Sequence, residues 1–266
     1  MYDKIADIER FEEELKEYTE VLKENSYKNY PNKLKELAEI RNIPLDELER
    51  AGIFYIGDMA EMVLLGKFEG RLKEYGVISS TNNKPIFTKR YVIPIKNSKG
   101  GVKNLVGYRS DSNERYLYGT AKYYDRTDTL YGLENTNEIY KSGYAILCEG
   151  ITDCIHIRSI GYKNCVSSCG TGARVSSMAM LDRLRYGVIT VPDRDIAGKN
   201  NMKNWELNNR NVSLYVSLGY KDADEFLRDS ANIEEFKEYM DTCIEWITSQ
   251  ENQGTLQDKK EVTILR

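Results

Sequence analysis

Three short apolar segments organise the chain between residues 144 and 224, and acidic residues follow each of them. The segments are Tyr144–Cys148, Tyr186–Val191 and Val212–Leu218, partly β-branched and bounded by glycine or proline. Patterns long enough for helices lie between them, for example at Asp153–Ile160 and Arg174–Arg185. Strands that alternate with helices indicate βαβ units and a parallel sheet. The sequence therefore predicts an α/β fold with a small parallel sheet flanked by helices.

Carboxylates follow the ends of all three predicted strands. The set comprises Glu149, Asp153, Asp193, Asp195, Asp222 and Asp224. Because ligands of open parallel sheets bind beyond the carboxyl ends of the strands, we expect these side chains to gather at one edge. Crowded carboxylates repel one another unless a cation neutralises them, and oxygen ligands favour a hard ion such as Mg²⁺. The pattern predicts a metal-dependent site for phosphoryl or nucleotidyl transfer. The plainer alternative is a set of solvated turn residues.

Four motifs in this region resemble the Toprim domain, which primases, topoisomerases and some nucleases share. They are Cys148–Asp153, Ser168–Thr171, Pro192–Gly198 and Gly219–Phe226. The last is similar to the segment that closes the domain in bacterial DnaG-type primases and phage primase-helicases, and other Toprim enzymes do not usually carry it in that form. One departure is Arg194, which stands between two aspartates where a small residue is frequent in the family.

The resemblance implies a DNA primase that makes short RNA primers on single-stranded DNA from nucleoside triphosphates. It implies that Glu149, Asp193 and Asp195 hold the catalytic divalent ions, Mg²⁺ or Mn²⁺. It also implies that Glu149 accepts the proton of the attacking 3′-hydroxyl. The other acids of the set would bind metal or support the ligands as additional carboxylates: Asp153, Asp222 and Asp224.

The N-terminal part of the chain predicts helices followed by a hairpin. Asp3–Asn25 has apolar positions three and four residues apart, so it predicts an amphipathic helix that packs on its own domain or docks to a partner protein. Shorter helices are predicted at Leu34–Arg41 and Leu45–Ala51, and a hairpin at Tyr91–Ile95 and Val102–Tyr108. This stretch resembles the mixed α+β subdomain that precedes the Toprim domain in primases.

Basic residues are concentrated between Lys84 and Arg126, although the whole chain carries a net charge of −4. Ten lysines and arginines stand against three acids in that stretch. By the resemblance, Arg109, Arg115 and Arg126 are candidates for binding the template strand and the incoming nucleotide. Lys199, near a predicted helix N-terminus, is a further candidate for contacting phosphate, with a solvent-facing lysine as the alternative.

These features divide the chain into four predicted regions. They are an N-terminal helix (1–30), an α+β subdomain with the basic hairpin (31–142), the Toprim domain (143–230) and a C-terminal helix with a polar tail (231–266). We expect the tail from Ser249 onward to be frayed, because it is polar and terminal.

Composition argues against several other kinds of site. Five cysteines without a Cys-x-x-Cys pair, and a single histidine, make a zinc site unexpected. The cysteines lie in or beside apolar runs and predict reduced, partly buried thiols. No apolar run approaches the roughly 20 residues that span a bilayer and no signal peptide is present, so we expect a cytoplasmic protein. The absence of a P-loop motif argues against an ATPase.

Two alternatives to a primase stay open on the sequence. A Toprim nuclease would use the same acids with water as the nucleophile, and would not need the basic hairpin. A non-catalytic nucleic-acid-binding protein could keep the fold alone. A topoisomerase would need a nucleophilic tyrosine on a separate large domain, for which the chain has no room. Without a zinc ribbon or helicase-binding domain, a primase of this kind is expected to rely on a replicative helicase and a separate zinc-ribbon or helper protein, as suits a phage enzyme in its host's cytoplasm.

Overall fold

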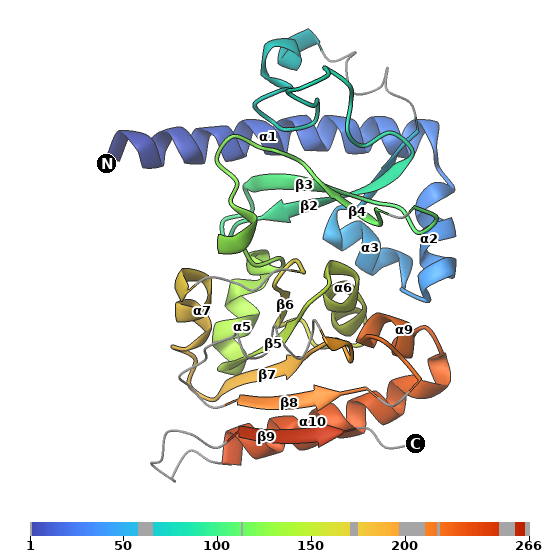
Figure 1. Ribbon diagram of the computed structural model, residues 1–266, viewed down its shortest axis with the longest axis vertical. Helices are drawn as coiled ribbons and strands as arrows, with labels where there is room; N and C mark the ends of the chain where they lie inside the picture. Colours follow the sequence, from blue (N-terminus) through green and yellow to red (C-terminus); the bar gives the residue numbers. More distant parts are fainter. Residues whose placement is uncertain are drawn as a thin grey trace. The chain divides into compact units, whose positions relative to one another are not determined.

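The computed structural model describes residues 2–57, 66–112, 114–170, 175–196, 211–216, 219–249 and 259–263 (Figure 1). Its contacts divide the chain into two compact units. The first comprises Met1–Ile40 and Pro44–Tyr124, and the second comprises Arg41–Ile43 and Asp125–Arg266.

In the described residues of the first unit, an antiparallel sheet is combined with three α-helices. The helices are α1 (Tyr2–Asn29), α2 (Lys33–Arg41) and α3 (Leu45–Ala51), with a 3₁₀ turn at Gly66–Arg71. The strands are β1 (Phe54–Ile56), β2 (Arg90–Lys96), β3 (Val102–Tyr108) and β4 (Tyr116–Tyr118), in that order across the sheet. The predicted hairpin is thus confirmed as β2 and β3, where Tyr91 pairs with Tyr108.

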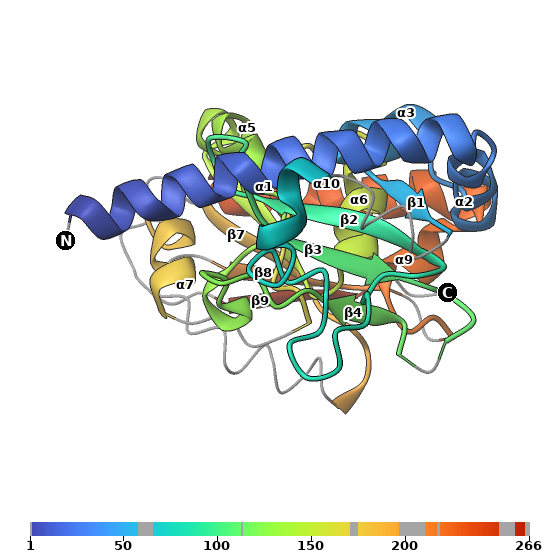
Figure 2. The ribbon, with the colours of Figure 1, turned by 90° about the horizontal axis from the view of Figure 1, so that it is seen from above.

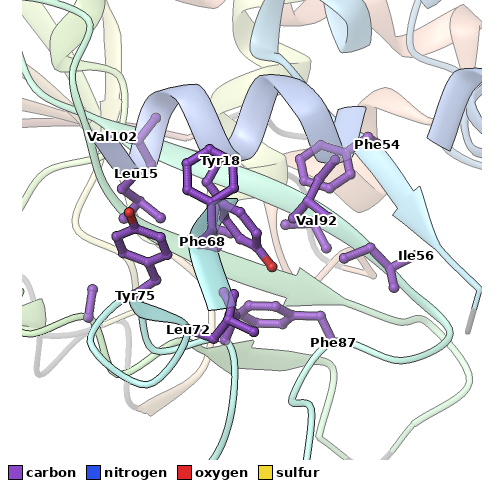
Figure 3. Packing of buried hydrophobic residues seen from close by; sticks show 14 of the residues in the cluster. Leu15, Tyr18, Phe54, Ile56, Phe68, Leu72, Tyr75, Phe87, Val92 and Val102 are labelled. Atoms are coloured by element: carbon purple, nitrogen blue, oxygen red, sulfur yellow. The ribbon is translucent and has the colours of Figure 1, made fainter. Parts of the chain in front are cut away.

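Helix α1 packs on the sheet of its own unit, against β1 and β3 (Figures 1 and 2). Phe11, Leu15, Tyr18 and Leu22 are buried in one cluster with residues of β1 and β2. Figure 3 shows Tyr18 within this core, where its ring lies 5.3 Å from that of Phe68. The predicted amphipathic helix is confirmed, and packing within the domain accounts for its apolar face.

The second unit is built on a parallel sheet with the strand order β6-β5-β7-β8-β9. The strands are β5 (Tyr144–Cys148), β6 (Cys165–Ser167), β7 (Gly187–Val191), β8 (Asn211–Tyr215) and β9 (Lys259–Thr263). The helices are α5 (Thr136–Ser142), α6 (Ile151–Ser159), α7 (Val175–Leu181), α9 (Ala223–Leu227) and α10 (Ile233–Ser249). Three 3₁₀ turns complete it, at Arg126–Asp128, Leu133–Asn135 and Ser230–Asn232. The α/β fold with a flanked parallel sheet, predicted from the alternating pattern, is confirmed.

Strand β5 is buried on both faces, as central strands of parallel sheets are. Ala145 and Leu147 pack with residues of α5 and α7 in one cluster. The alternate residues, Ile146 and Cys148, are buried as well. This two-sided burial is why the strand reads in the sequence as a continuous apolar run.

The expectation of a frayed tail is wrong for Lys259–Thr263. These residues form β9, which pairs in parallel with β8 along its whole length. Backbone N–H and C=O groups at the edge of a sheet favour pairing with an added strand, and such pairing does not require an apolar sequence. The polar composition of the tail therefore concealed a strand.

Candidate active site

Acidic residues of two neighbouring strands meet where β5 and β7 end. Glu149 directly follows β5, and Asp193 follows β7 after one proline. The chain places β6 on one side of β5 and β7 on the other, so the strand order reverses at this point. Ligands of open α/β sheets bind at such a reversal. The backbone N–H of Asp193 donates a hydrogen bond to Glu149 Oε1 at 3.2 Å, which joins the two residues directly.

The backbone of Glu149 is held by the turn that follows β6. Its carbonyl accepts hydrogen bonds from the Ser167 hydroxyl at 2.7 Å and from the Gly170 N–H at 2.8 Å. Gly170 has a φ of +71°, which glycine adopts without strain. Arg126, one of the predicted basic site residues, donates from Nη2 to the Cys169 carbonyl of the same turn at 2.8 Å. The Glu149 side chain is buried, with 6 % of the residue exposed.

Asp193 lies in an environment that disfavours its charge. Burial and the nearby negative charge of Glu149 raise the pKa of Asp193 to about 6, although Lys221 opposes the shift. A carboxylate next to another carboxylate releases its proton more readily when a further cation approaches. The two neighbouring carboxylates therefore repel each other, and Lys221 offsets this repulsion only in part.

Lys221 supplies positive charge beside Asp193, and sequence reasoning did not single it out. Its Nζ lies 3.1 Å from Oδ2 of Asp193 and 3.9 Å from Oδ2 of Asp195. The Asp195 side chain is exposed, and Lys221 is the link that the structure gives it to Asp193. The only sequence signal was the position of Lys221 inside the motif Gly219–Phe226, between recognised acids.

Arg194 does not take part in this ion pairing among the contacts that the structure records. Its guanidinium lies over the ring of Tyr215 on β8, 5.8 Å from the centroid. The backbone N–H of Arg194 donates to the Lys221 carbonyl at 2.8 Å, which ties the loop after β7 to the loop before α9. The departure from the family's pattern is thus accommodated by stacking on an aromatic ring.

Asp153 lies behind the edge, on the first turn of α6. It is buried, and its Oδ1 accepts a hydrogen bond from the Asp224 N–H at 2.8 Å. Burial, followed by the charges of the surrounding aspartates, raises the pKa of Asp153 well above its usual value. A Cβ at Gly150 would stand 2.2 Å from Asp153 Oδ2, so only glycine permits this approach.

The two aspartates of α9 have different surroundings. Asp222 caps the helix, accepting the Glu225 N–H at 2.8 Å, and burial raises its pKa. Asp224 is 2 % exposed and its Oδ2 accepts hydrogen bonds from both Arg41 and Arg228.

His156 approaches the other oxygen of Asp224, with 3.3 Å between Nδ1 and Oδ1. Burial alone would raise the pKa of Asp224, but the bonds from His156 and Arg228 and the charge of Arg41 hold it at about 2. Nitrogen donors already occupy this carboxylate, so Asp224 serves as an anchor between elements, and its role as an additional acid at the metal site stays a prediction. The same contact gives the buried His156 a defined partner.

Two of the predicted basic site residues lie in the first unit, at the turn between β3 and β4. The Arg109 N–H donates to the Arg115 carbonyl at 2.9 Å, and the Arg109 guanidinium pairs with Asp111 at 2.9 Å. The buried Arg90 donates to the Glu114 carbonyl at 2.9 Å and so supports the turn from inside. Lys199 lies outside the described residues.

The acids at the β5–β7 edge offer only oxygen donors, which suits a hard divalent cation. Their oxygens are not closely gathered. Three or more cysteine, histidine or acidic residues could hold a metal ion where their ligand atoms all lie within 4.8 Å of one another. In the described part of the chain, Cys148, Cys154 and Cys165 form such a group, and the acids at this edge do not. All five cysteines are free and buried. In the described part of the chain, no helix combines the length and the apolar character needed to cross a bilayer.

Comparison with known proteins finds a family model and relatives that resemble parts of this chain. Residues 146–227 match the family described as Toprim-like. The DNA primase of Aquifex aeolicus is 29 % identical over 172 residues, 60 % of this chain and 34 % of that protein. The DNA primase of Borreliella burgdorferi is 32 % identical over 131 residues, 48 % of this chain and 25 % of that protein. The chain thus spans about a third or less of the length of these curated relatives.

Solved structures agree on the architecture. The Aquifex aeolicus primase structure, with zinc-binding and RNA polymerase domains, has a TM-score of 0.70 at 24 % identity and covers 86 % of this chain and 61 % of that one. A DnaG primase catalytic domain bound to single-stranded DNA has a TM-score of 0.72 at 17 % identity, over 90 % and 84 %. The E. coli primase catalytic core has a TM-score of 0.68 at 16 % identity, over 94 % and 98 %. The chain has a Toprim fold of the kind seen in DnaG-type primase cores.

Proposed function

We propose that this chain is the catalytic core of a DNA primase, which synthesises short RNA primers on single-stranded DNA from nucleoside triphosphates. The observation that carries the proposal is the direct contact between Glu149 and Asp193 where the strand order reverses. Further support comes from the relatives, which are named DNA primases, and from a neighbouring catalytic domain bound to single-stranded DNA.

Glu149, Asp193 and Asp195 would hold the divalent ions, Mg²⁺ or Mn²⁺, with Asp153, Asp222 and Asp224 as supporting acids. When bound, such ions neutralise the charge that develops on the attacking and leaving oxygens of nucleotidyl transfer. The donor set fits this role because Glu149 raises the pKa of Asp193 and a second positive charge would relieve that repulsion.

The protein's own side chains position the reaction. Glu149 is fixed through both its carbonyl and its carboxylate, and would accept the proton of the attacking 3′-hydroxyl. Lys221, which pairs with Asp193, and Arg126, which binds the turn after β6, would contact the triphosphate. Lys199, which the sequence places near a predicted helix N-terminus, would do the same.

Template binding is assigned to the first unit. Arg109 and Arg115 flank one turn and would neutralise phosphates of the single strand, which makes binding weaken as salt rises. We also propose that the protein works in the cytoplasm with a replicative helicase and a separate zinc-ribbon or helper protein, and that it originates from a phage.

One assay tests the proposal. Single-stranded circular DNA is incubated with labelled ribonucleoside triphosphates and Mg²⁺, using the wild type, Glu149→Gln, Asp193→Asn and the exposed control Asp7→Asn. We expect new labelled oligonucleotides with the wild type and the control, and a loss of at least about 10²-fold with the two site variants, as for other groups that stabilise transition-state charge.

The same assay separates the alternatives. Shortened DNA without added nucleotides, abolished by the same variants, would identify a nuclease. DNA retention without either product would identify a binding protein. Labelled oligonucleotides that persist in Asp193→Asn would refute the assignment of the site while leaving a polymerase activity to be located elsewhere.

A further inference from the structure

Three buried cysteines meet in the core of the second unit, apart from the acidic edge. Cys148 ends β5, Cys154 lies in α6 and Cys165 begins β6. The βαβ connection brings them together, because β5 and β6 are adjacent parallel strands and α6 is the crossover between them. All three residues have no exposed surface. Their sulfur atoms all lie within 4.8 Å of one another.

The separation between two of the three sulfur atoms matches that required around a metal ion, and the third lies within 4.8 Å of both. An ion bound by three thiolates at about 2.3 Å, the usual zinc–sulfur distance, needs sulfur–sulfur separations of about 4 Å in a trigonal plane. The separation between Cys148 Sγ and Cys165 Sγ is 3.9 Å. An ion at the centre of such a triangle would need no cavity beyond the space between the sulfurs.

We propose that Cys148, Cys154 and Cys165 form a buried three-thiolate site for one thiophilic d¹⁰ ion, of the class of Zn²⁺, Cd²⁺ or Cu⁺. Thiolate is a soft ligand that selects such ions over Mg²⁺. The site is therefore chemically separate from the oxygen ligands at the β5–β7 edge, although Cys148 directly precedes Glu149.

Burial raises the pKa of the Cys148 and Cys165 thiols, and the positive charge of a bound ion would offset this cost of forming thiolates. A divalent ion with three thiolates carries one net negative charge. Arg158, one helical turn after Cys154, is buried and its positive charge interacts with that cysteine. Arg158 Nη1 pairs with Glu134 at 2.9 Å, which holds the guanidinium in place.

Metal binding would exchange protons for the ion. In the thiol form, Cys154 Sγ donates to the Cys165 carbonyl at 3.3 Å and Cys148 Sγ donates to the Val166 carbonyl at 3.4 Å. When a divalent ion binds, three S–H protons leave to solvent and three metal–sulfur bonds form, with no change in the oxidation state of sulfur. No oxidant or reductant is needed.

The test uses Cd²⁺ as the probe on the reduced full chain. Cadmium bound to thiolate absorbs in the ultraviolet by charge transfer from sulfur, and cadmium bound to oxygen ligands does not. We expect the absorbance to saturate at one ion per chain. Cys165→Ala and Cys154→Ala should each weaken binding by at least about 10-fold, since even lost supporting partners of a metal ligand cost that much.

Two matched controls should leave the absorbance unchanged. Cys243→Ala removes a buried cysteine of α10 that is outside the triad, and Asp193→Asn alters the acidic edge. Absence of the charge-transfer band in the wild type would overturn the proposal. So would a full band in both triad variants, or an equal loss in Cys243→Ala.

A second measurement avoids dependence on core variants that fold poorly. Bound Cd²⁺ should slow alkylation of the three triad cysteines of the wild type in mild denaturant, as read by mass spectrometry. Cys243 should be labelled at the same rate with and without the ion. Uniform labelling rates at all four positions, unaffected by Cd²⁺, would overturn the proposal.

Discussion

Asp193 and Asp224 belong to the same unit, yet their surroundings act on their charge in opposite directions. Asp193 has Glu149 as a close neighbour, and its pKa is raised to about 6. Asp224 is surrounded by Arg41, Arg228 and His156, and its pKa is held at about 2. Both follow predicted strands within acidic motifs, and the sequence predicts metal binding for both.

The comparison shows that the charged side chains around a carboxylate, rather than the acidic motif in which it lies, determine its role. Asp224 has cations supplied by the protein and stabilises the fold. Asp193 has another acid beside it, and among the described residues its compensating cation is Lys221, whose side chain is 54 % exposed. A carboxylate of the second kind has something to gain from an added divalent ion.

The largest change in the free energy of unfolding is expected from Asp224→Asn. The amide cannot neutralise Arg41, whose side chain is only 7 % exposed. Removing one partner of a buried ion pair costs about 3–5 kcal/mol. Urea unfolding monitored by circular dichroism measures this, with Asp7→Asn as the exposed control. A free energy of unfolding within error of the wild type would show that Asp224 is not an anchor.

Asp193→Asn should reduce activity without reducing stability. Primer synthesis should fall at least about 10²-fold, because the variant lacks the carboxylate that is proposed to hold the divalent ions. The free energy of unfolding should not fall, since a repulsion with Glu149 is removed. Measuring both quantities on one preparation checks this; a variant that is destabilised as strongly as Asp224→Asn would make the two aspartates equivalent.

The contributions of the two carboxylates to the stability of the fold should depend on pH in opposite ways. Asp193 binds its proton more tightly when folded, so its contribution to stability falls as pH rises from about 4, the unfolded pKa, to about 6. Asp224 contributes stability above about pH 4, which is lost as pH falls toward about 2.

The difference between wild type and Asp193→Asn isolates the first effect. In buffer containing a chelator, the variant should gain roughly 1–3 kcal/mol relative to the wild type between about pH 4 and 6. Unfolding curves at several pH values measure it. A constant difference across that interval would mean that the pKa of Asp193 is not raised.

The smallest effect is expected from Lys221→Ala. Removing an exposed ammonium that pairs with Asp193 should strengthen Mg²⁺ binding by roughly 2- to 5-fold, in line with the 0.2–1 kcal/mol of exposed ion pairs. Thermal shift against Mg²⁺ concentration measures the affinity. Lys237→Ala, which breaks a surface pair with Glu234, is the control. Weaker Mg²⁺ binding in Lys221→Ala would contradict the competition.

The sequence was sufficient where a local pattern determines structure. Tyr144–Cys148 is β5 with the same bounds, and Leu45–Ala51 is α3, because apolar runs and flanking proline and glycine are local signals. The meeting of Glu149 with Asp193 followed from the rule for parallel sheets.

Contacts between distant residues could not be predicted in this way. Arg41 stands 183 residues from Asp224, and no local pattern links them. Strand β9 is polar and is defined only by its pairing with β8. The cysteine triad has no metal-binding spacing in the sequence, because a crossover helix and two strands bring its members together.

The short segment Arg41–Ile43 belongs to the second unit, while the residues on both sides of it belong to the first. A fragment that starts at Asp125 would therefore contain the whole parallel sheet and still lack Arg41, one of the cations of Asp224. Recombination or proteolysis at a single point could not transfer this domain intact. The stability of the second unit depends on a few residues that lie more than eighty positions before Asp125 in the sequence.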